Sequence, residues 1–344
     1  MGEKLGEAHR CNHRSVDRTL LHQTLVRHGE PPYRGRQVWA WLARGAGRYA
    51  EMTDLPATLR AALEQDVPLS TLALEHTAHA SDGTVKALLR TVRGAPVEAV
   101  LMRYRDGRRS VCLSAQSGCP LTCTFCATGR MRFAGNLSAD EIVDQALYFR
   151  RSGPVDHAVF MGMGEPMMNL DAVLEACALL PDLGISQRRI AISTVGWIPG
   201  IERLTASGTS IRLALSLHAP EDALRSALMP VNERYPLADV LDACRAHYAA
   251  RRRTVFIEYV MLAGVNDRYE QALALARLLS PREAFKVNLI PYNPTDSQYA
   301  GSGRDAIAAF RAALEARGVR VTVRLTRGRE IAAACGQLAA GAAA

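Results

Sequence analysis

Strands that alternate with helices constrain the fold of this chain more than any other feature. From about residue 105 onward, short apolar stretches with strand character occur at 110–113, 157–161, 189–193, 211–217, 254–261, 285–290 and 319–325. Amphipathic helical segments such as 138–151 and 237–250 separate them, and Ser138-Ala-Asp-Glu141 opens the first with a capping-box sequence. This order predicts an α/β fold with parallel strands and right-handed crossovers, in an open or partial barrel of about six β/α units. We expect functional side chains at the carboxyl ends of these strands.

The chain before residue 105 has a different pattern. Residues 1–14 carry no chemical signal and are predicted to be a disordered tail. Residues 15–68 have helical periodicity and predict a small accessory domain, in which Trp39 and Trp41 are interpreted as core residues rather than base-stacking platforms. Residues 69–104 alternate as strands around a turn at Ser81-Asp-Gly-Thr84 and predict a short connecting sheet. Residues 105–344 are then the catalytic domain.

Three cysteines lie in one tight loop after the first of the parallel strands. Cys119, Cys123 and Cys126 fall within the string Ser117-Gly-Cys-Pro-Leu-Thr-Cys-Thr-Phe-Cys-Ala-Thr-Gly129, whose glycines and proline favour a turn. A closed zinc site needs four ligands, and no fourth Cys or His follows at a zinc-finger interval. Three thiolates suit an iron–sulfur cluster that keeps one iron open. The alternative is three ordinary core cysteines, which the clustering disfavours.

Composition sets wider bounds on the partner and the compartment. The net charge of +8 and the pI near 9.2 favour a polyanionic partner, although high Arg and Ala usage also accompanies GC-rich genomes. Eight unevenly spaced cysteines fit a reducing compartment better than a secreted disulfide framework. No apolar run has the length of a membrane span or of a signal sequence, so we expect a cytoplasmic protein that does not associate with membranes.

The spacing Cys-x-x-x-Cys-x-x-Cys also resembles the signature of the radical SAM superfamily. The strings Gln116-Ser-Gly-Cys119 and Ala127-Thr-Gly129 around it are similar to those of the RlmN/Cfr family of RNA adenine methyltransferases, and the resemblance extends over about residues 15 to 340. It implies a radical SAM barrel of partial (β/α)6 type preceded by an RNA-binding helical domain. It also implies a [4Fe-4S] cluster on Cys119, Cys123 and Cys126, and S-adenosylmethionine (SAM) on the open iron.

The same resemblance implies which residues bind SAM. Gly164 and Glu165, in Phe160-Met-Gly-Met-Gly-Glu-Pro166, match the site of the SAM amino group. The other matching residues are Ser193, Ser216, Leu217, His218 and Asn293, all at predicted strand ends. Taken without the resemblance, a lone His is usually structural, and an Asn before Pro is an ordinary turn residue.

Three further residues carry the chemistry that the resemblance implies. Cys335, in Ala334-Cys-Gly-Gln-Leu338, matches the cysteine that accepts a methyl group from a first SAM, although composition alone would make it a packing residue. A second SAM then supplies the radical that couples this methyl carbon to adenine. Glu98 matches the general base, and Cys112 matches the cysteine that attacks Cys335 to release the RNA and form a disulfide. Without the resemblance, a Glu in such a strand is most often ion-paired or on the solvent-exposed face.

We expect methylation of adenine carbon 2 in 23S rRNA, with tRNA as a further substrate and flavodoxin or ferredoxin as the electron donor to a monomeric enzyme. Methylation at carbon 8, as in Cfr, is the alternative, since the string at 228–236 is similar to Cfr and Thr326-Arg-Gly328 to RlmN. Other hypotheses are a zinc-stabilised RNA-binding module without catalysis, and a radical SAM enzyme of another kind, such as a methylthiotransferase. The Arg-rich segments 103–109, 251–253 and 317–329 either hold RNA phosphates or are solvated faces.

Overall fold

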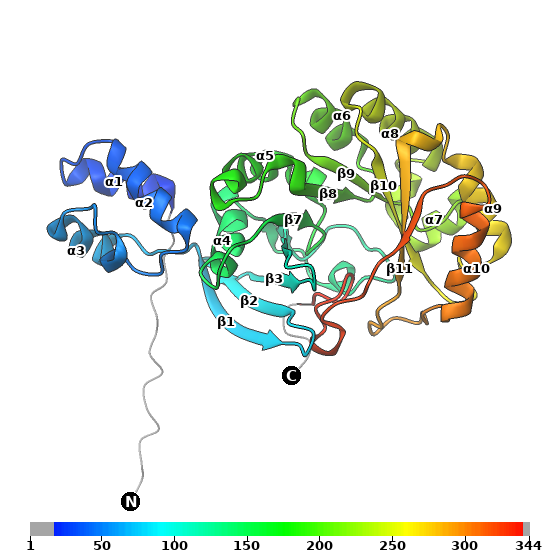
Figure 1. Ribbon diagram of the computed structural model, residues 1–344, viewed down its shortest axis with the longest axis horizontal. Coiled ribbons are helices and arrows are strands. Elements are labelled where there is room, and N and C mark those ends of the chain that lie inside the picture. Colours follow the sequence, from blue (N-terminus) through cyan, green and yellow to red (C-terminus); the bar gives the residue numbers. More distant parts are fainter. Residues whose placement is uncertain (1–16, 340–344) are drawn as a thin grey trace, which may run out of the picture.

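The computed structural model describes residues 17–339, so the predicted disordered tail at 1–14 lies outside the described residues. Three helices come first: α1 (Arg18–Arg27), α2 (Tyr33–Arg44) and α3 (Ala57–Asp66), at one end of the molecule (Figure 1). Asp17 starts α1 because its carboxylate accepts the backbone N–H groups of Thr19 and Leu20, at 2.8 and 3.0 Å. These helices pack on a small apolar core that is continuous with the core of the rest of the protein.

The tryptophans of α2 stabilise this packing. The indole Nε1 of Trp41 donates to Asp54 at 2.6 Å, and that of Trp39 donates to Asp182, beyond the accessory helices, at 2.7 Å. Both rings are partly buried against the core. Their contacts account for both residues by packing and hydrogen bonding.

A single ten-stranded sheet forms the rest of the framework, in the order β1-β2-β3-β4-β7-β8-β9-β10-β11-β12. Its strands are β1 (Leu72–His79), β2 (Val85–Thr91), β3 (Pro96–Arg103), β4 (Arg109–Cys112), β7 (His157–Phe160), β8 (Ile190–Thr194), β9 (Arg212–Ser216), β10 (Val255–Met261), β11 (Phe285–Pro291) and β12 (Val321–Val323). The strands from β4 to β12 are parallel, whereas β1 to β4 are antiparallel. The predicted connecting sheet is therefore an antiparallel extension of the barrel sheet, joined to it where β3 pairs with β4. A separate pair, β5 (Gln116–Ser117) and β6 (Gly135–Asn136), lies beside the cysteine loop.

Helices cover the outer face of the curved sheet (Figure 1). They are α4 (Ala139–Arg150), α5 (Leu170–Leu179), α6 (Ile198–Ala206), α7 (Asp222–Leu228), α8 (Leu237–Arg251), α9 (Tyr269–Leu278) and α10 (Arg304–Glu315). The predicted capping box is present at the start of α4, where Ser138 and Glu141 exchange side-chain to backbone hydrogen bonds of 2.8 and 3.1 Å. In the described part of the chain, no helix is both long and apolar enough to cross a membrane.

Strand alternation decides which side chains enter the barrel. In β10, for example, Ile257 and Tyr259 pack into the core under the helices, so the intervening Glu258 lies on the inner face. In β9 the same alternation buries Leu213 and Leu215 and leaves Arg212 and Ser216 inside. The barrel interior thus carries polar and charged residues such as Glu258 and Ser216 among apolar ones such as Met161 and Val260.

Candidate active site

The cysteine loop follows β4 and closes one end of the barrel interior. Cys119, Cys123 and Cys126 all line a single cavity of about 120 Å³, together with Gly164 and Glu165. Burial raises the pKa of the Cys119 thiol to about 12 and that of Cys123 well above its usual value. A cationic group is needed to stabilise these thiolates in so buried a place.

The donor set fits an iron–sulfur cluster better than a single ion. Within residues 17–339, no three Cys, His, Asp or Glu side chains converge as one metal ion requires. Thiolates of a four-iron cluster bind different irons and do not need to converge on one atom. The three cysteines around one cavity fit the cluster, and this geometry does not support the zinc hypothesis.

The turn after β7 lies directly against the cysteine loop. A Cβ atom at Gly162 would lie 2.6 Å from the Ser114 hydroxyl, and one at Gly164, whose φ is +91°, would collide with the Gln116 side chain. Only glycine permits this close approach. The turn directs Glu165 inward, where its carboxylate accepts the backbone N–H groups of Val195 and Met167, both at 3.0 Å.

Glu165 is buried and lies beside the cluster cavity. Burial raises the pKa of its carboxyl to about 7, although its backbone hydrogen bonds act in the opposite direction. A ligand ammonium group would favour the ionised form and offset this burial cost. The chemistry of the site therefore suits the amino group of SAM.

The next two parallel strands contribute the predicted serines and histidine. The hydroxyls of Ser193 and Ser216 lie 3.3 Å apart at the ends of β8 and β9, and both residues line a cavity of about 150 Å³ with Glu165 and His218. Nδ1 of His218 accepts the backbone N–H of Val260 at 3.1 Å. Burial, together with nearby Arg225, lowers the pKa of His218 to about 3, so its ring is neutral and fixed in one orientation.

Leu217 and Asn293 differ from the other predicted SAM residues. The Leu217 side chain packs into the apolar core, so its backbone alone is available for a ligand. Asn293 follows β11 and donates to the backbone oxygen of Cys335 at 3.3 Å. In this structure Asn293 therefore holds the Cys335 loop, and its contact with SAM remains a prediction.

Cys335 returns to the barrel on the segment after β12. It lines both the 150 Å³ cavity and a larger one of about 450 Å³ that contains Cys112. Burial raises the pKa of Cys112 to about 12, and the neighbouring Cys335 acts in the same direction. Both cysteines are free thiols, with Cys335 exposed and Cys112 buried.

Glu98 lies apart from these cavities, on the inner face of β3. Its carboxylate, 2% exposed, forms an ion pair with Lys86 at 2.9 Å and accepts the backbone N–H of Ala339 at 2.8 Å. Lys86 also donates to the backbone oxygen of Ala332 at 3.2 Å. The structure thus brings Glu98 to the segment that carries Cys335 and does not bring it to the surface of the three cavities.

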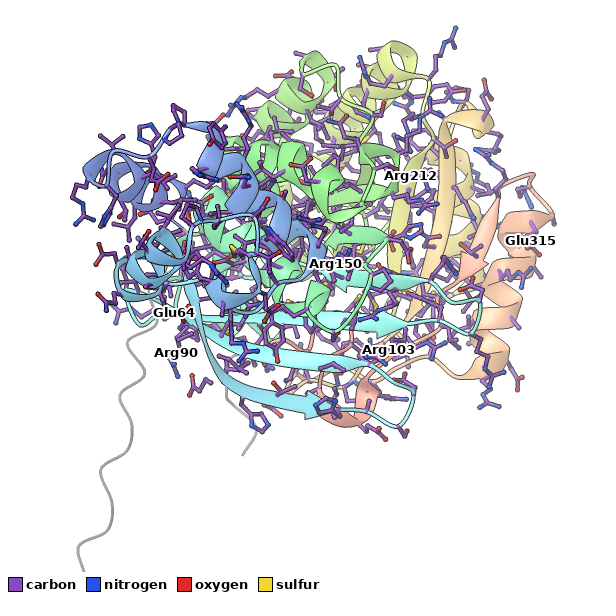
Figure 2. All side chains as sticks on the ribbon, turned by 60° about the vertical axis from the view of Figure 1, so that its left-hand side comes forward. Glu64, Arg90, Arg103, Arg150, Arg212 and Glu315 are labelled. Atoms are coloured by element: carbon purple, nitrogen blue, oxygen red, sulfur yellow. The ribbon has the colours of Figure 1, made fainter. Side chains whose placement is uncertain are left out.

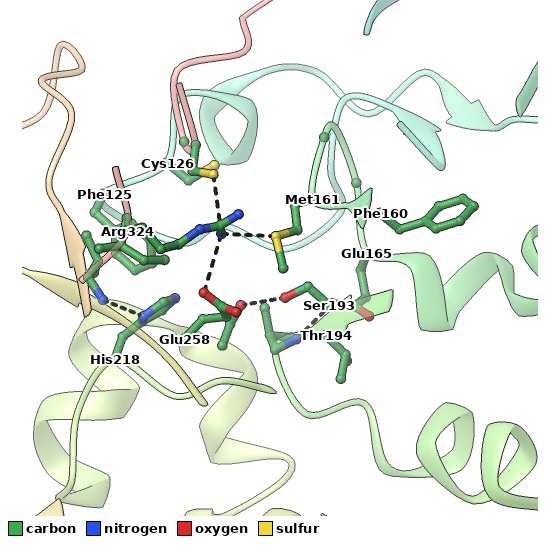
Figure 3. A pocket seen from close by; sticks show the side chains of 18 of the residues that line it. Phe125, Cys126, Phe160, Met161, Glu165, Ser193, Thr194, His218, Glu258 and Arg324 are labelled. Atoms are coloured by element: carbon green, nitrogen blue, oxygen red, sulfur yellow. Dashed lines mark hydrogen bonds and ion pairs between the residues drawn. The ribbon is translucent and has the colours of Figure 1, made fainter. Parts of the chain in front are cut away.

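Sequence reasoning missed two charged residues of the site. Arg324 of the loop after β12 forms an ion pair with Glu258 at 3.4 Å (Figure 3). Its guanidinium is also 3.9 Å from the sulfur of Cys335. Burial by itself lowers the pKa of Arg324, but the charges of Cys335 and Glu258 outweigh it and raise the pKa. The sequence signal for Arg324 was an arginine inside the predicted strand 319–325.

Arg225 of α7 is the second missed residue and is fully buried. Its guanidinium donates to the backbone oxygens of Leu217, at 3.2 Å, and Val195, and to the side chain of Asn232 at 2.6 Å. It therefore ties together the segments after β8 and β9 that carry the predicted SAM residues. An arginine within the helical string Asp222-Ala-Leu-Arg-Ser-Ala-Leu228 was its sequence signal.

Comparisons with known proteins agree with this geometry. Residues 113–276 match the family model of the radical SAM superfamily, and residues 11–68 match that of the ribosomal RNA large subunit methyltransferase N-terminal domain. The probable dual-specificity RNA methyltransferase RlmN of Chloroflexus aurantiacus is 46% identical over 340 residues, covering 93% of this chain and 90% of that protein. The dual-specificity RNA methyltransferase RlmN of Geobacter sulfurreducens is 45% identical, covering 92% of this chain and 89% of that protein.

A solved structure gives the same result. The crystal structure of a radical SAM methyltransferase from Sphaerobacter thermophilus superposes with a TM-score of 0.87 at 43% identity, covering 93% of this chain and 96% of that one. The predicted α/β radical SAM fold is therefore confirmed. Barrel, cysteine loop and N-terminal domain together identify the chain as a radical SAM RNA methyltransferase that belongs to the RlmN family.

Proposed function

We propose that this enzyme methylates carbon 2 of an adenine in 23S rRNA and in tRNA. The observation that carries the proposal is the position of Cys335 between two cavities, one with Glu165 and the cysteine loop and the other with Cys112. Relatives named dual-specificity RNA methyltransferase support two classes of RNA substrate. The cofactors are a [4Fe-4S] cluster and SAM, and the proposed chemistry uses two SAM molecules per turnover.

Cys119, Cys123 and Cys126 would hold the cluster, which when bound supplies the electron that cleaves SAM. Glu165 receives the SAM amino group, and Gly164 allows the backbone to approach it. The hydroxyls of Ser193 and Ser216, the backbone of Leu217, the ring of His218 and the amide of Asn293 orient the rest of the molecule. The neutral, fixed His218 ring suits an uncharged part of this ligand.

Cys335 is the methyl carrier in this proposal. Its sulfur attacks the methyl group of one SAM, the bond from that methyl to the SAM sulfur breaks, and S-adenosylhomocysteine leaves. The thioether formed faces the 450 Å³ cavity, which we assign to the target adenine. The Arg324 guanidinium lies 3.9 Å from this sulfur and, as a hydrogen-bond donor, orients it.

Glu98 and Cys112 complete the cycle. A radical that the cluster and a second SAM would supply when bound would remove one hydrogen atom from the S-methyl group, so that its carbon could join the adenine ring, and the adduct would then give one electron back to the cluster. Glu98 accepts the ring proton that is lost with it, for which its hydrogen bond to Ala339 must be exchanged. Cys112 then attacks the sulfur of Cys335, the bond from that sulfur to carbon breaks, and the methylated RNA leaves. The resulting disulfide needs an external reductant before the next cycle.

The partners and domain roles form part of the same proposal. Residues 15–68 act as an RNA-binding accessory domain, 69–104 connect it to the barrel, and 105–344 carry out catalysis. We propose flavodoxin or ferredoxin as the electron donor, a monomeric enzyme, and action in the cytoplasm, where ribosomal RNA is found.

Mass spectrometry of nucleosides tests the function. A 23S rRNA transcript and a tRNA are each incubated without oxygen with the reconstituted enzyme, SAM and a reductant, beside the Cys335→Ala variant. We expect 2-methyladenosine with the wild type and none with the variant. If 8-methyladenosine forms instead, the position that the enzyme methylates is carbon 8 and not carbon 2. Methylation by the Cys335→Ala variant would refute the carrier role of Cys335.

A further inference from the structure

A second large cavity lies at the opposite ends of the barrel strands from the cysteine loop. It has a volume of about 400 Å³ and is lined by residues at the amino ends of the strands, including His157 of β7, Arg212 of β9 and Phe256 of β10. Arg188 and Arg189, which precede β8, also line it and are exposed. None of these residues has a role in the proposed chemistry.

The arginines here gather without acidic partners. Arg253 donates to the backbone oxygen of Arg188 at 3.2 Å, and its pKa is lowered by burial and by the like charges of Arg212 and Arg188. We call Arg188, Arg189, Arg212 and Arg253 the basic cluster. Across residues 17–339, the ion pairs beside the cavity are those of Asp106 with Arg108 and Asp156 with His157, and no member of the basic cluster takes part in one.

Some donors of the basic cluster are buried and unused. Nε of Arg212 and Nη1 of Arg253 are enclosed and have no hydrogen-bond partner among the described residues. Buried donors without acceptors are costly, and like charges held together add to that cost. Arg188, Arg189 and Arg212 line the cavity, so an anion bound there offsets the repulsion among these like charges.

Aromatic rings hold two of the guanidinium groups in place. Arg212 lies over the ring of Phe256 at 4.4 Å (Arg212 is labelled in Figure 2), and Arg108 lies over Tyr104 at 4.6 Å. A stacked guanidinium keeps its N–H donors at its rim, in the flat arrangement that matches two phosphate oxygens.

The cavity adjoins the one assigned to the target adenine. Tyr104, Arg108 and Val159 line both of them. A nucleotide whose base enters the Cys335 cavity therefore has its own neighbours in the chain close to the basic cluster. A polynucleotide satisfies this geometry, since it presents a phosphate at every nucleotide.

We propose that the basic cluster binds backbone phosphates of the RNA strand whose adenine enters the Cys335 cavity. The inference rests on the proposed function for the identity of the strand. It adds a phosphate-binding site at the amino end of the barrel, opposite the end that holds SAM.

Fluorescence anisotropy with an RNA stem-loop that carries an adenosine in its loop tests the site. The variant is R188Q/R189Q, in which both changes are on exposed side chains, and the matched control is R277Q/R304Q, with two exposed arginines on α9 and α10. We expect the R188Q/R189Q variant to bind about tenfold more weakly at low salt, with a salt dependence of log K less steep by about 1.5. The control is expected to match the wild type, and all three proteins to have equal melting temperatures.

Inorganic phosphate, titrated against RNA at constant ionic strength, distinguishes the sources of phosphate. If the variant loses binding of inorganic phosphate but keeps RNA affinity, the assignment to RNA is overturned. Equal RNA affinity and salt dependence in wild type and variant, or equal weakening in the control, would overturn the site itself. A third outcome is RNA binding that R188Q/R189Q weakens in an enzyme whose wild type forms no methyladenosine. This outcome would support the basic cluster as a phosphate site and overturn only the proposed function.

Discussion

Replacing Lys86 by methionine removes the cation that faces Glu98 inside the protein. The two charges are 2.9 Å apart, and their side chains are 14% and 2% exposed. At an effective dielectric constant of about 20, their attraction is about 6 kcal/mol before the cost of desolvation. Breaking a buried pair from one side costs about 3 to 5 kcal/mol, because the other charge stays behind. We expect about 3 kcal/mol for Lys86→Met, since Glu98 keeps its bond to Ala339.

Removing both charges is expected to restore most of this loss. In K86M/E98Q no charge remains in the pair, and the Gln amide oxygen still accepts the Ala339 N–H, so we expect a net cost of about 1 kcal/mol. Melting temperatures measured without oxygen provide the assay. At roughly 2 °C for each kcal/mol in a protein of this size, Lys86→Met should melt about 6 °C below the wild type and the double variant about 2 °C below it.

Two results would refute this reasoning about the pair. One is a Lys86→Met variant that melts within 1 °C of the wild type, which would make the pair energetically unimportant. The other is a double variant whose loss equals the sum of the two single losses, which would show that the charges do not interact. The single variant Glu98→Gln distinguishes a folding defect from the loss of the proton acceptor. We expect this variant to carry a methyl group on Cys335, detected by mass spectrometry, and to form no methyladenosine.

Three further changes test other parts of the structure. Arg225→Met leaves buried backbone oxygens without their donor, so we expect the free energy of unfolding to fall by about 3 kcal/mol. We also expect SAM to bind at least tenfold more weakly in equilibrium dialysis. Unchanged SAM affinity would contradict the role given to Arg225. Burial raises the pKa of Asp144 to about 6, so its ionisation costs the folded state about 3 kcal/mol above pH 6, and this cost is relieved as the pH falls toward 4. Asp144→Asn should therefore melt above the wild type at pH 8, keep about half of that advantage at pH 5 and lose most of it by pH 4, and an advantage independent of pH would rule this out. Gly164→Ala forces a Cβ into the Gln116 side chain at a positive φ, so we expect reconstituted protein to hold less iron per chain, and a full iron content would show that the turn tolerates the change.

The sequence predicted the framework because its signals are local. Strand periodicity and the capping box at Ser138 depend on neighbouring residues only, and each predicted strand of the barrel is present within a few residues of its expected bounds. The cysteine loop after β4 and the glycine turn after β7 could also be recognised from the sequence. Close approach of the backbone restricts the turn positions to glycine.

What the sequence left open depends on contacts between distant segments. Arg225, in α7, stabilises loops after two other strands, and no neighbouring residue indicates this. Lys86 and Glu98 are diagonal neighbours on β2 and β3, yet both also bind the segment around Cys335, more than 200 residues away. The basic cluster likewise joins arginines from several strand ends, and of its members only Arg253 lies in an Arg-rich segment recognised from the sequence.

The contacts between β1–β3 and the Cys335 segment also determine how much of the chain must be made before the site is complete. Glu98 and Ala339 are 241 residues apart in the chain, and Asp82 of the turn between β1 and β2 binds the backbone N–H of Gly328 over a separation of 246 residues. During synthesis, β1 to β3 emerge long before the segment that they hold, and the whole barrel is made in between. The methyl-carrying thiol is therefore placed only when the last part of the chain has been made, and a chain whose synthesis stops before residue 328 has β1 to β3 without the segment that they hold and without a carrier for the methyl group.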